Sequence, residues 1–385
     1  MVSRAERGLV ADWFWTIDRV FLIAFVLLMA LGFMLSFAAS PAVAERIGLD
    51  SFYFVKRHAV FLLPTLVVMI GVSFLTPRQV RRAALFIFGL STLLMVLALF
   101  IGVEVKGSRR WIALAGISIQ PSEFMKPAFV ILCAWLFSEH SRQPEIPGNL
   151  FAIILFVIIS ALLLAQPDLG QTVLVAAIWG GMFFMAGMPW FWIILFGVVG
   201  VGGILGAYTA FPHVQGRIDR FLTGEGDTYQ VDTAREAIIR GDWFGRGPGE
   251  GTIKRILPDS HTDFIFAVAA EEFGIIFCMA LVVIFAFIVL RGLSHASRER
   301  DDFTRLAISG LVLLIGLQSL INISVNLELA PAKGMTLPLI SYGGSSMIAV
   351  AISVGFLLAL TRRRPEKRSS ERSLFGDFGF RVPAE

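Results

Sequence analysis

The chain has 385 residues, of which 56% are hydrophobic and only 16% are charged, with a mean hydropathy of +0.76. This composition excludes a disordered chain, a collagen-like repeat and most soluble enzymes, since soluble domains carry about 25% charged residues. The formal net charge of +4 is too small and too scattered to indicate a nucleic-acid partner. Cys133 and Cys278 lie in apolar runs, so we interpret both as packing residues rather than as a disulfide or metal ligands.

At about 20 residues per crossing, the hydropathy pattern predicts an all-α polytopic membrane protein with about ten transmembrane helices. The expected spans are 18–39, 58–75, 83–102, 122–138, 150–165, 170–187, 189–211, 263–290, 304–327 and 343–361. The fourth span carries charges near its start, and only a short polar link separates the fifth span from the sixth. A total of eight or nine spans is therefore an alternative. The first run precedes Ala42-Val43-Ala44, which resembles a signal-peptide cleavage site, but its length favours an uncleaved helix.

The spans divide the chain into a segment 1–17, a transmembrane domain 18–361 and a basic tail 362–385. A cytoplasmic N-terminus places 18 of the Lys and Arg residues on the inner side. Of the Lys and Arg residues on the outer side, seven lie in the long loop 212–262 and eight in the short outer segments. Because positive charge gathers on the cytoplasmic side, both termini are expected there. The loop 212–262 is then extracytoplasmic and, being unusually long, is expected to be partly structured and functional.

Several motifs are absent. The sequence contains no phosphate-binding loop of the G-x-x-x-x-G-K-[ST] type and no H-E-x-x-H zinc motif. The Gly-rich run 245–251 misses the dinucleotide pattern and is interpreted as a flexible loop, with a backbone anion nest as the alternative. The sequence therefore requires no cofactor and predicts no metal site. A substrate on the outer face, where ATP is absent, should carry its own activation.

Asp263 is the first candidate residue. It follows Ser260-His261-Thr262 and precedes an apolar run, so Ser260 and Asp263 fit a helix capping box. The alternative is chemistry, because Asp263 is expected at the membrane surface directly after the long loop.

Two further carboxylates, Glu271 and Glu272, are expected about 12 Å farther along the same helix. Ionisable groups within a span need partners. Gln318, Asn322 and Asn326 are spaced by four residues and share one helix face. We expect hydrogen bonds between these two helices, as a structural polar seam or as a functional pair.

Polar residues also mark the other outer segments. Ser122 is expected to cap a helix, and Glu123 and Lys126 to form an ion pair. Alternatively, Lys126 forms a cationic pocket for phosphate with Arg109 and Arg110. Asp168 fits a capping box with Gln171, which makes it a structural residue. Lys333 is the only cation of the last outer segment.

These segments together resemble the SEDS proteins (shape, elongation, division and sporulation). Five motifs carry the resemblance in chain order: 106–112 (Lys-Gly-Ser-Arg-Arg-Trp-Ile), 120–123 (Gln-Pro-Ser-Glu) with Lys126, 166–170 (Gln-Pro-Asp-Leu-Gly), 257–266 (Leu-Pro-Asp-Ser-His-Thr-Asp-Phe-Ile-Phe) with 271–274 (Glu-Glu-Phe-Gly), and 337–346 (Leu-Pro-Leu-Ile-Ser-Tyr-Gly-Gly-Ser-Ser). Residues 331–336 and Lys254 are most similar to the cell-division member of the family. Asp259 departs from the Glu found in many members.

The resemblance implies a ten-span peptidoglycan glycosyltransferase that polymerises lipid II on the outer face of the cytoplasmic membrane during septal cell-wall synthesis. Its implied partners are a class B penicillin-binding protein and other division proteins. Asp263 takes the place of the family's catalytic carboxylate, and we interpret it as a general base. The expected substrate-binding residues are Arg109, Trp111, Glu123, Lys126, Lys254, His261, Lys333 and Ser341, with Arg110, Arg246 and Arg255 behind them.

Two other functions stay open at this point. The intramembrane polar residues would also suit a lipid II flippase, although most of them lie toward the outer side. A non-catalytic scaffold of the division machinery would tolerate changes at Asp263. A divalent cation that bridges Asp263 and the substrate diphosphate is a further alternative.

Overall fold

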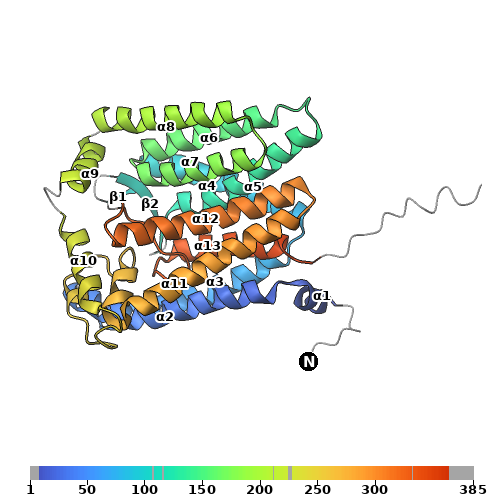
Figure 1. The fold of residues 1–385 in the computed structure, drawn as a ribbon. Helices are drawn as coiled ribbons and strands as arrows, with labels where there is room; N and C mark the ends of the chain where they lie inside the picture. Colours follow the sequence, from blue (N-terminus) through green and yellow to red (C-terminus); the bar gives the residue numbers. More distant parts are fainter. Residues whose placement is uncertain are drawn as a thin grey trace, which may run out of the picture.

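The computed structural model describes residues 8–105, 108–114, 117–210, 212–223, 228–331 and 333–363. Each of the ten expected spans coincides with one helix, and these helices run side by side (Figure 1). They are α2 (Arg19–Arg46), α3 (Tyr53–Ser73), α4 (Pro77–Ile101), α5 (Pro121–Arg142), α6 (Gly148–Ala165), α7 (Leu169–Met185), α8 (Trp190–Ala210), α11 (Ile265–Arg298), α12 (Asp302–Asn326) and α13 (Ser345–Leu360).

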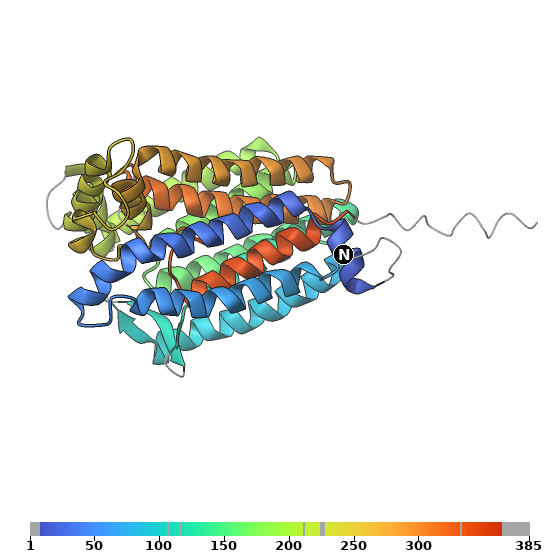
Figure 2. The same cartoon turned by 90° about the horizontal axis from the view of Figure 1, so that it is seen from below.

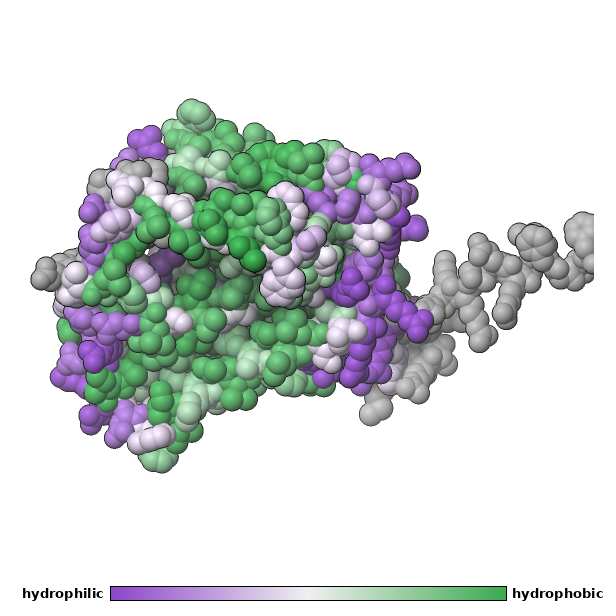
Figure 3. All heavy atoms as spheres, turned by 45° about the horizontal axis from the view of Figure 1, so that its top comes forward, coloured by the Kyte–Doolittle hydropathy of each residue, from purple (hydrophilic) through white to green (hydrophobic). Residues whose placement is uncertain are grey.

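Seven of these helices are long and apolar enough to cross a membrane by length and composition, among the residues described. The helices α7 and α13 are apolar but shorter, and α5 has 22 residues. The outer surface of the bundle is apolar along its middle and hydrophilic at both ends (Figure 3). The protein is therefore a multi-pass membrane protein, and the prediction of about ten transmembrane helices agrees with this arrangement.

The fold is almost entirely helical, as predicted, with one small sheet in addition. The segment between α4 and α5 forms a three-stranded antiparallel sheet of β1 (Val103–Val105), β2 (Ser108–Leu114) and β3 (Ile117–Ile119). The strands are short and contain charged residues, so the hydropathy pattern did not reveal them. A short helix α1 (Leu9–Thr16) also precedes the first span.

The long loop is partly structured, as expected. It contains α9 (Pro212–Thr223), α10 (Tyr229–Gly241) and the 3₁₀ turn η1 (Ile253–Arg255). These elements and the sheet lie at the same end of the bundle, opposite the N-terminus (Figures 1 and 2). We call this end the loop end.

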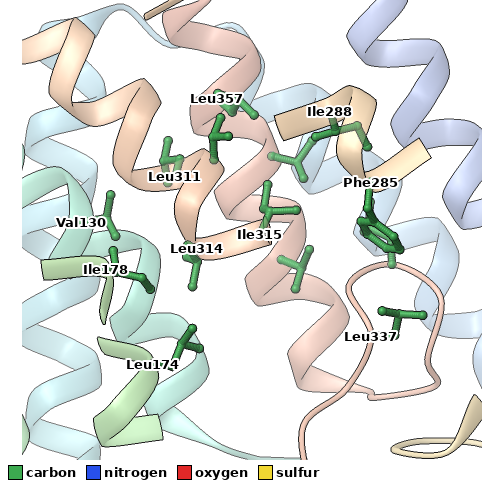
Figure 4. Packing of buried hydrophobic residues seen from close by; sticks show 14 of the residues in the cluster. Val130, Leu174, Ile178, Phe285, Ile288, Leu311, Leu314, Ile315, Leu337 and Leu357 are labelled. Atoms are coloured by element: carbon green, nitrogen blue, oxygen red, sulfur yellow. The ribbon is translucent and has the colours of Figure 1, made fainter. Parts of the chain in front are cut away.

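Three helices form the centre of the bundle. The described side chains of α13 are buried almost without exception, and two thirds of the apolar window of α12 is buried. Figure 4 shows Val130 of α5, Leu311 of α12 and Leu357 of α13 in this core. Glycine permits the close packing, because a Cβ at Gly310 of α12 would lie 2.6 Å from a methyl carbon of Val130. By contrast, α8 lies at the periphery with only 6% of its apolar window buried.

The helix α11 is broken at Gly274, where φ is +82°. The loop after α10 docks into the break and replaces the lost helical hydrogen bonds. The N–H groups of Arg246 and Gly247 donate to the carbonyls of Glu271 and Glu272 at 2.8 and 3.0 Å, and the N–H of Ile275 donates to the Asp242 carbonyl at 2.9 Å. A Cβ at Gly274 would lie 2.3 Å from a loop carbonyl oxygen, so the break requires glycine.

Candidate active site

Asp263 lies in a turn directly before α11. The helix begins at Ile265 with Phe264 at the N-cap and no side-chain cap, and the Ser260 hydroxyl has no hydrogen-bond partner among the described residues. The expected capping box of Ser260 and Asp263 is therefore wrong, because the chain turns once more before the helix starts. Asp263 is consequently placed by groups from other parts of the chain.

Two buried amides of α12 hold the backbone of Asp263. The Nδ2 atoms of Asn322 and Asn326 donate to the Asp263 carbonyl at 2.8 and 3.0 Å. The Asn326 Oδ1 atom accepts from the Ala267 N–H at 3.2 Å, which joins α12 to the first turn of α11. Since buried amides are costly to leave unpaired, these bonds define the position of Asp263 closely.

The segment before α13 passes beside the Asp263 carboxylate. A Cβ at Gly334 would lie 2.8 Å from the Asp263 Oδ2 atom. The Asn322 Nδ2 atom also donates to the Met335 carbonyl at 2.6 Å. The Ser341 hydroxyl donates to the Thr262 carbonyl at 2.6 Å. Ser341 therefore positions the turn that carries Asp263.

A buried ion pair lies at the start of α5. The Lys126 ammonium is 2.8 Å from the Glu123 carboxylate, and both side chains are almost fully buried. The Lys126 ammonium also donates to Gln318 of α12 at 3.1 Å, and Gln171 of α7 donates to Glu123 at 2.8 Å. The cap of α5 is Gln120 without a side-chain hydrogen bond, so the expected Ser122 cap is wrong.

Asp168 joins two more cations to this group. Its carboxylate lies 3.0 Å from the Arg110 guanidinium and 3.4 Å from the Lys333 ammonium. It also accepts from the Gln171 N–H at 3.3 Å, so the expected cap at α7 is present. Burial raises the pKa of Asp168, but Lys333 and Arg110 outweigh burial and hold the pKa below its usual value.

Lys333 is the least neutralised cation of this cluster. Its ammonium makes no hydrogen bond among the described residues, and burial lowers its pKa to about 8. Gly170 leaves the space that it fills, because a Cβ there would lie 2.0 Å from the Lys333 Nζ atom. We call Arg110, Glu123, Lys126, Asp168 and Lys333 the cation cluster, which carries one net positive charge when all five groups are ionised.

The cation cluster and Asp263 belong to one site. Lys333 is the residue before Gly334, which lies against the Asp263 carboxylate. Gln318 binds both Lys126 and the Thr336 carbonyl, the latter at 3.1 Å. The Asp263 carboxylate and a group of fixed cations thus lie along one segment, 333–336.

Several predicted residues lie elsewhere. Arg109 forms an exposed ion pair with Glu104 at 3.3 Å, whereas Arg110 reaches the cluster. Neighbouring side chains of a strand point to opposite faces, so β2 separates the two arginines. Trp111 pairs across the sheet with Val103, and in the described part of the chain no hydrogen bond joins its side chain to the cluster. The sequence alone favours Arg109 over Arg110, because the alternation of side chains becomes visible only once β2 is known.

The predicted seam of Glu271 and Glu272 with α12 is wrong for these two carboxylates. The Glu271 carboxylate accepts the N–H groups of Thr252, Ile253 and Lys254 at 2.7 to 2.9 Å. Glu272 forms an ion pair with the Lys254 ammonium and accepts the Gly249 N–H at 3.1 Å. The loop that docks at the α11 break takes the place of α12 amides.

This docking also changes the interpretation of Lys254 and of the Gly-rich run. Lys254 is neutralised by Glu272 and does not join the cation cluster. The Gly-rich run 245–251, expected to be a flexible loop, is hydrogen-bonded to Glu271 and Glu272 of α11.

His261 stacks on Tyr342 and lies with its ring 4.2 Å from that of Phe54, and burial lowers its pKa to about 4. Its ring is therefore neutral at neutral pH.

Comparison with known proteins gives the family. Residues 18–366 match the family model FTSW_RODA_SPOVE, described as cell cycle protein. The chain belongs to this family. It is 48% identical over 380 residues to the "Probable peptidoglycan glycosyltransferase FtsW" of Caulobacter vibrioides, with 98% of this chain and 96% of the relative covered. It is 35% identical to the protein of the same name from Neisseria gonorrhoeae, with 90% and 85% covered.

Two solved structures share the fold. One chain, from a structure described as "Structural coordination of polymerization and crosslinking by a peptidoglycan synthase complex", matches with a TM-score of 0.75 at 26% identity. It covers 90% of this chain and 97% of that one. The rod shape determining protein RodA of Thermus thermophilus matches with a TM-score of 0.65 at 26% identity, covering 90% and 96%.

Proposed function

We propose that this chain polymerises lipid II into glycan strands at the loop end of the bundle, with Asp263 as general base. The chain is a peptidoglycan glycosyltransferase, in agreement with its family and the names of its relatives. The observation that carries the mechanism is the segment 333–336, which places the cation Lys333 next to the glycine that contacts Asp263.

The chemistry follows from the two kinds of group. A sugar hydroxyl of the acceptor attacks the anomeric carbon of the donor, and Asp263 takes the hydroxyl proton. The bond between the anomeric carbon and the diphosphate oxygen breaks, and the leaving diphosphate gains negative charge. Lys333, Arg110 and Lys126 stabilise this charge where water is scarce. Attack opposite the leaving group inverts the anomeric centre, by analogy with inverting glycosidases.

The surface of the bundle supports entry of a lipid-linked substrate from the membrane. Figure 3 shows a hollow near the loop end of the apolar surface, with hydrophilic residues on its floor. The polyprenyl tail would stay against the apolar helices while the diphosphate sugar enters the polar interior. We place the loop end outside the cell, because the Lys and Arg pattern puts both termini in the cytoplasm.

The proposed partner is a class B penicillin-binding protein, which crosslinks the new strands. Its support is the similarity to the chain from a peptidoglycan synthase complex. Septal localisation, together with other division proteins, is proposed from the similarity to proteins named FtsW.

The test uses purified protein in detergent with labelled lipid II and the cognate penicillin-binding protein, made transpeptidase-inactive. Asp263→Asn should lower strand formation by about 10²- to 10⁴-fold, the range of general-base catalysis. Glu236→Gln, on the exposed face of α10, is the matched control and should keep the wild-type rate. Equal strand formation by Asp263→Asn and wild type would remove Asp263 from the mechanism.

The same assay separates the alternatives. Micelles have no second leaflet, so strands made in detergent require polymerisation and exclude a pure flippase. A non-catalytic scaffold would make no strands with either variant. Repeating the wild-type assay with a chelator tests whether a divalent cation joins Asp263 and the diphosphate. No group of three or more His, Cys, Asp or Glu residues that could hold a metal occurs in the described part of the chain.

A further inference from the structure

A cavity lies at the loop end, apart from the cation cluster. Its volume is about 170 Å³. It is lined by Phe37, Pro41, Ala42 and Glu45 of α2 and by Gly249, Lys254 and Arg255 of the docked loop. None of these residues belongs to the proposed catalytic site, so the cavity is an unused feature of the fold.

The cavity changes from apolar to charged along α2. From Phe37 to Glu45 the helix rises about 12 Å, which is close to the depth of one leaflet's hydrocarbon region. The Phe37 ring is half-exposed on the outer surface of the bundle, whereas Glu45 lies one residue from the helix end. An occupant with an apolar body and a polar head would match this gradient.

The polar end of the cavity holds unmatched charges of both signs. Lys254 is neutralised by Glu272, but no described residue pairs with the Arg255 guanidinium. Among the described residues the Glu45 carboxylate accepts only the Ser51 hydroxyl, at 3.1 Å, and no ion pair joins it to Arg255. A cation and a carboxylate in one cavity complement a zwitterion. A dianionic diphosphate would be repelled by Glu45.

A primary ammonium has three donors and can form hydrogen bonds to the Glu45 carboxylate. A quaternary ammonium has no donors and cannot.

We propose that this cavity binds the head group of a zwitterionic phospholipid with a primary ammonium. The phosphate lies on Arg255, the ammonium on Glu45, and the glycerol and acyl chains along Phe37 and Ala42. The bound lipid joins α2 to the docked loop, beside the existing bond from Arg46 to the Leu257 carbonyl at 2.9 Å. This proposal is independent of the catalytic role of Asp263.

The experiment measures lipid binding to the purified full chain in detergent by native mass spectrometry. The probes are phosphatidylethanolamine, phosphatidylcholine and phosphatidylglycerol with identical acyl chains. Wild type should retain phosphatidylethanolamine about fivefold better than the other two, as expected for about one charge-assisted contact in partly exposed surroundings. Glu45→Gln should abolish this preference, whereas Arg255→Gln should lower the retention of all three lipids, because they share the phosphate. The exposed outer residues Arg235 and Glu236, changed to Gln, are the matched controls and should keep the preference and the retention.

The wild-type measurement alone can overturn the proposal, so it does not depend on how the variants fold. Equal retention of the three lipids excludes a site specific for a primary ammonium. A preference for phosphatidylglycerol would mean an anionic ligand and would also refute the role of Glu45. A preference that survives Glu45→Gln, or a retention that Arg255→Gln leaves unchanged, would place the lipid elsewhere on the protein.

Discussion

Gly170 offers a test of Lys333 that leaves the lysine itself in place. A Cβ at position 170 would lie 1.8 to 2.1 Å from the Cδ, Nζ and Cε atoms of Lys333. The end of a lysine side chain is flexible, so Gly170→Ala should fold with its ammonium displaced. None of the three atoms nearest to the added Cβ belongs to the backbone. Alanine also favours a helix relative to glycine.

The size of the effect follows from the displacement. To reach ordinary contact at about 3.4 Å, the Nζ atom must retreat by about 1.4 Å from its present 2.0 Å. An ammonium that moves from about 2.8 Å to about 4.2 Å from a phosphate oxygen loses about 2 kcal/mol at an effective dielectric constant of about 20. This loss corresponds to a rate about 30-fold lower, if the contact acts on the leaving diphosphate.

The assay is lipid II polymerisation in detergent, with thermal unfolding measured on the same samples. Gly180→Ala is the matched control, because Gly180 lies on the same helix α7 with nothing within 4 Å of an added Cβ. We expect Gly180→Ala to polymerise within about twofold of wild type. If Gly170→Ala folds and is as active as Gly180→Ala, Lys333 does not act on the substrate and the reasoning is refuted.

Four further predictions follow from the structure. Arg110→Ala should lower the polymerisation rate at least about tenfold, whereas Arg109→Ala should stay within about twofold, because only Arg110 reaches the cation cluster; the reverse order would contradict the strand geometry. Glu271→Ala should cost about 3 kcal/mol or more of stability, seen as a lower melting temperature in detergent, since three backbone N–H groups lose their acceptor. Gly274→Ala should expose the docked loop to limited proteolysis, because its φ of +82° and the nearby loop backbone exclude a Cβ; an unchanged digestion pattern would refute the docking. The kcat/KM for lipid II should fall as pH rises through about 8, because the Lys333 ammonium is lost there, and Lys333→Arg should remove this step.

The membrane-spanning architecture can be predicted from local stretches of the sequence. A bilayer imposes a nearly constant helix length and an apolar composition, so each span is visible in a local window of the chain. All ten expected spans have a helix, including the doubtful fourth, which is α5. The family was also visible, because its five motifs are contiguous runs of residues.

The partners of the polar side chains, by contrast, depend on how distant segments fold together. Glu271 lies on α11, which neighbours α12, so the sequence predicts that Glu271 faces α12. Its carboxylate instead binds the backbone of η1. Glu271 meets this backbone because α11 is broken at Gly274, where the loop after α10 packs against α11. No local window contains both segments, so hydropathy and spacing could not reveal the contact.

The assembly of the active site could not be predicted from local sequence for the same reason, because its residues come from separate segments. The sequence marks Asp263, Lys126, Asp168 and Lys333 as unusual polar residues, but three of them also fit a local role, Asp263 and Asp168 as caps and Lys126 in an ion pair. Their assembly requires the link before α7, the start of α5 and the segment before α13 to meet at the loop end. Local sequence determines which residues a membrane tolerates and where helices begin, whereas the folded bundle decides which charges face one another.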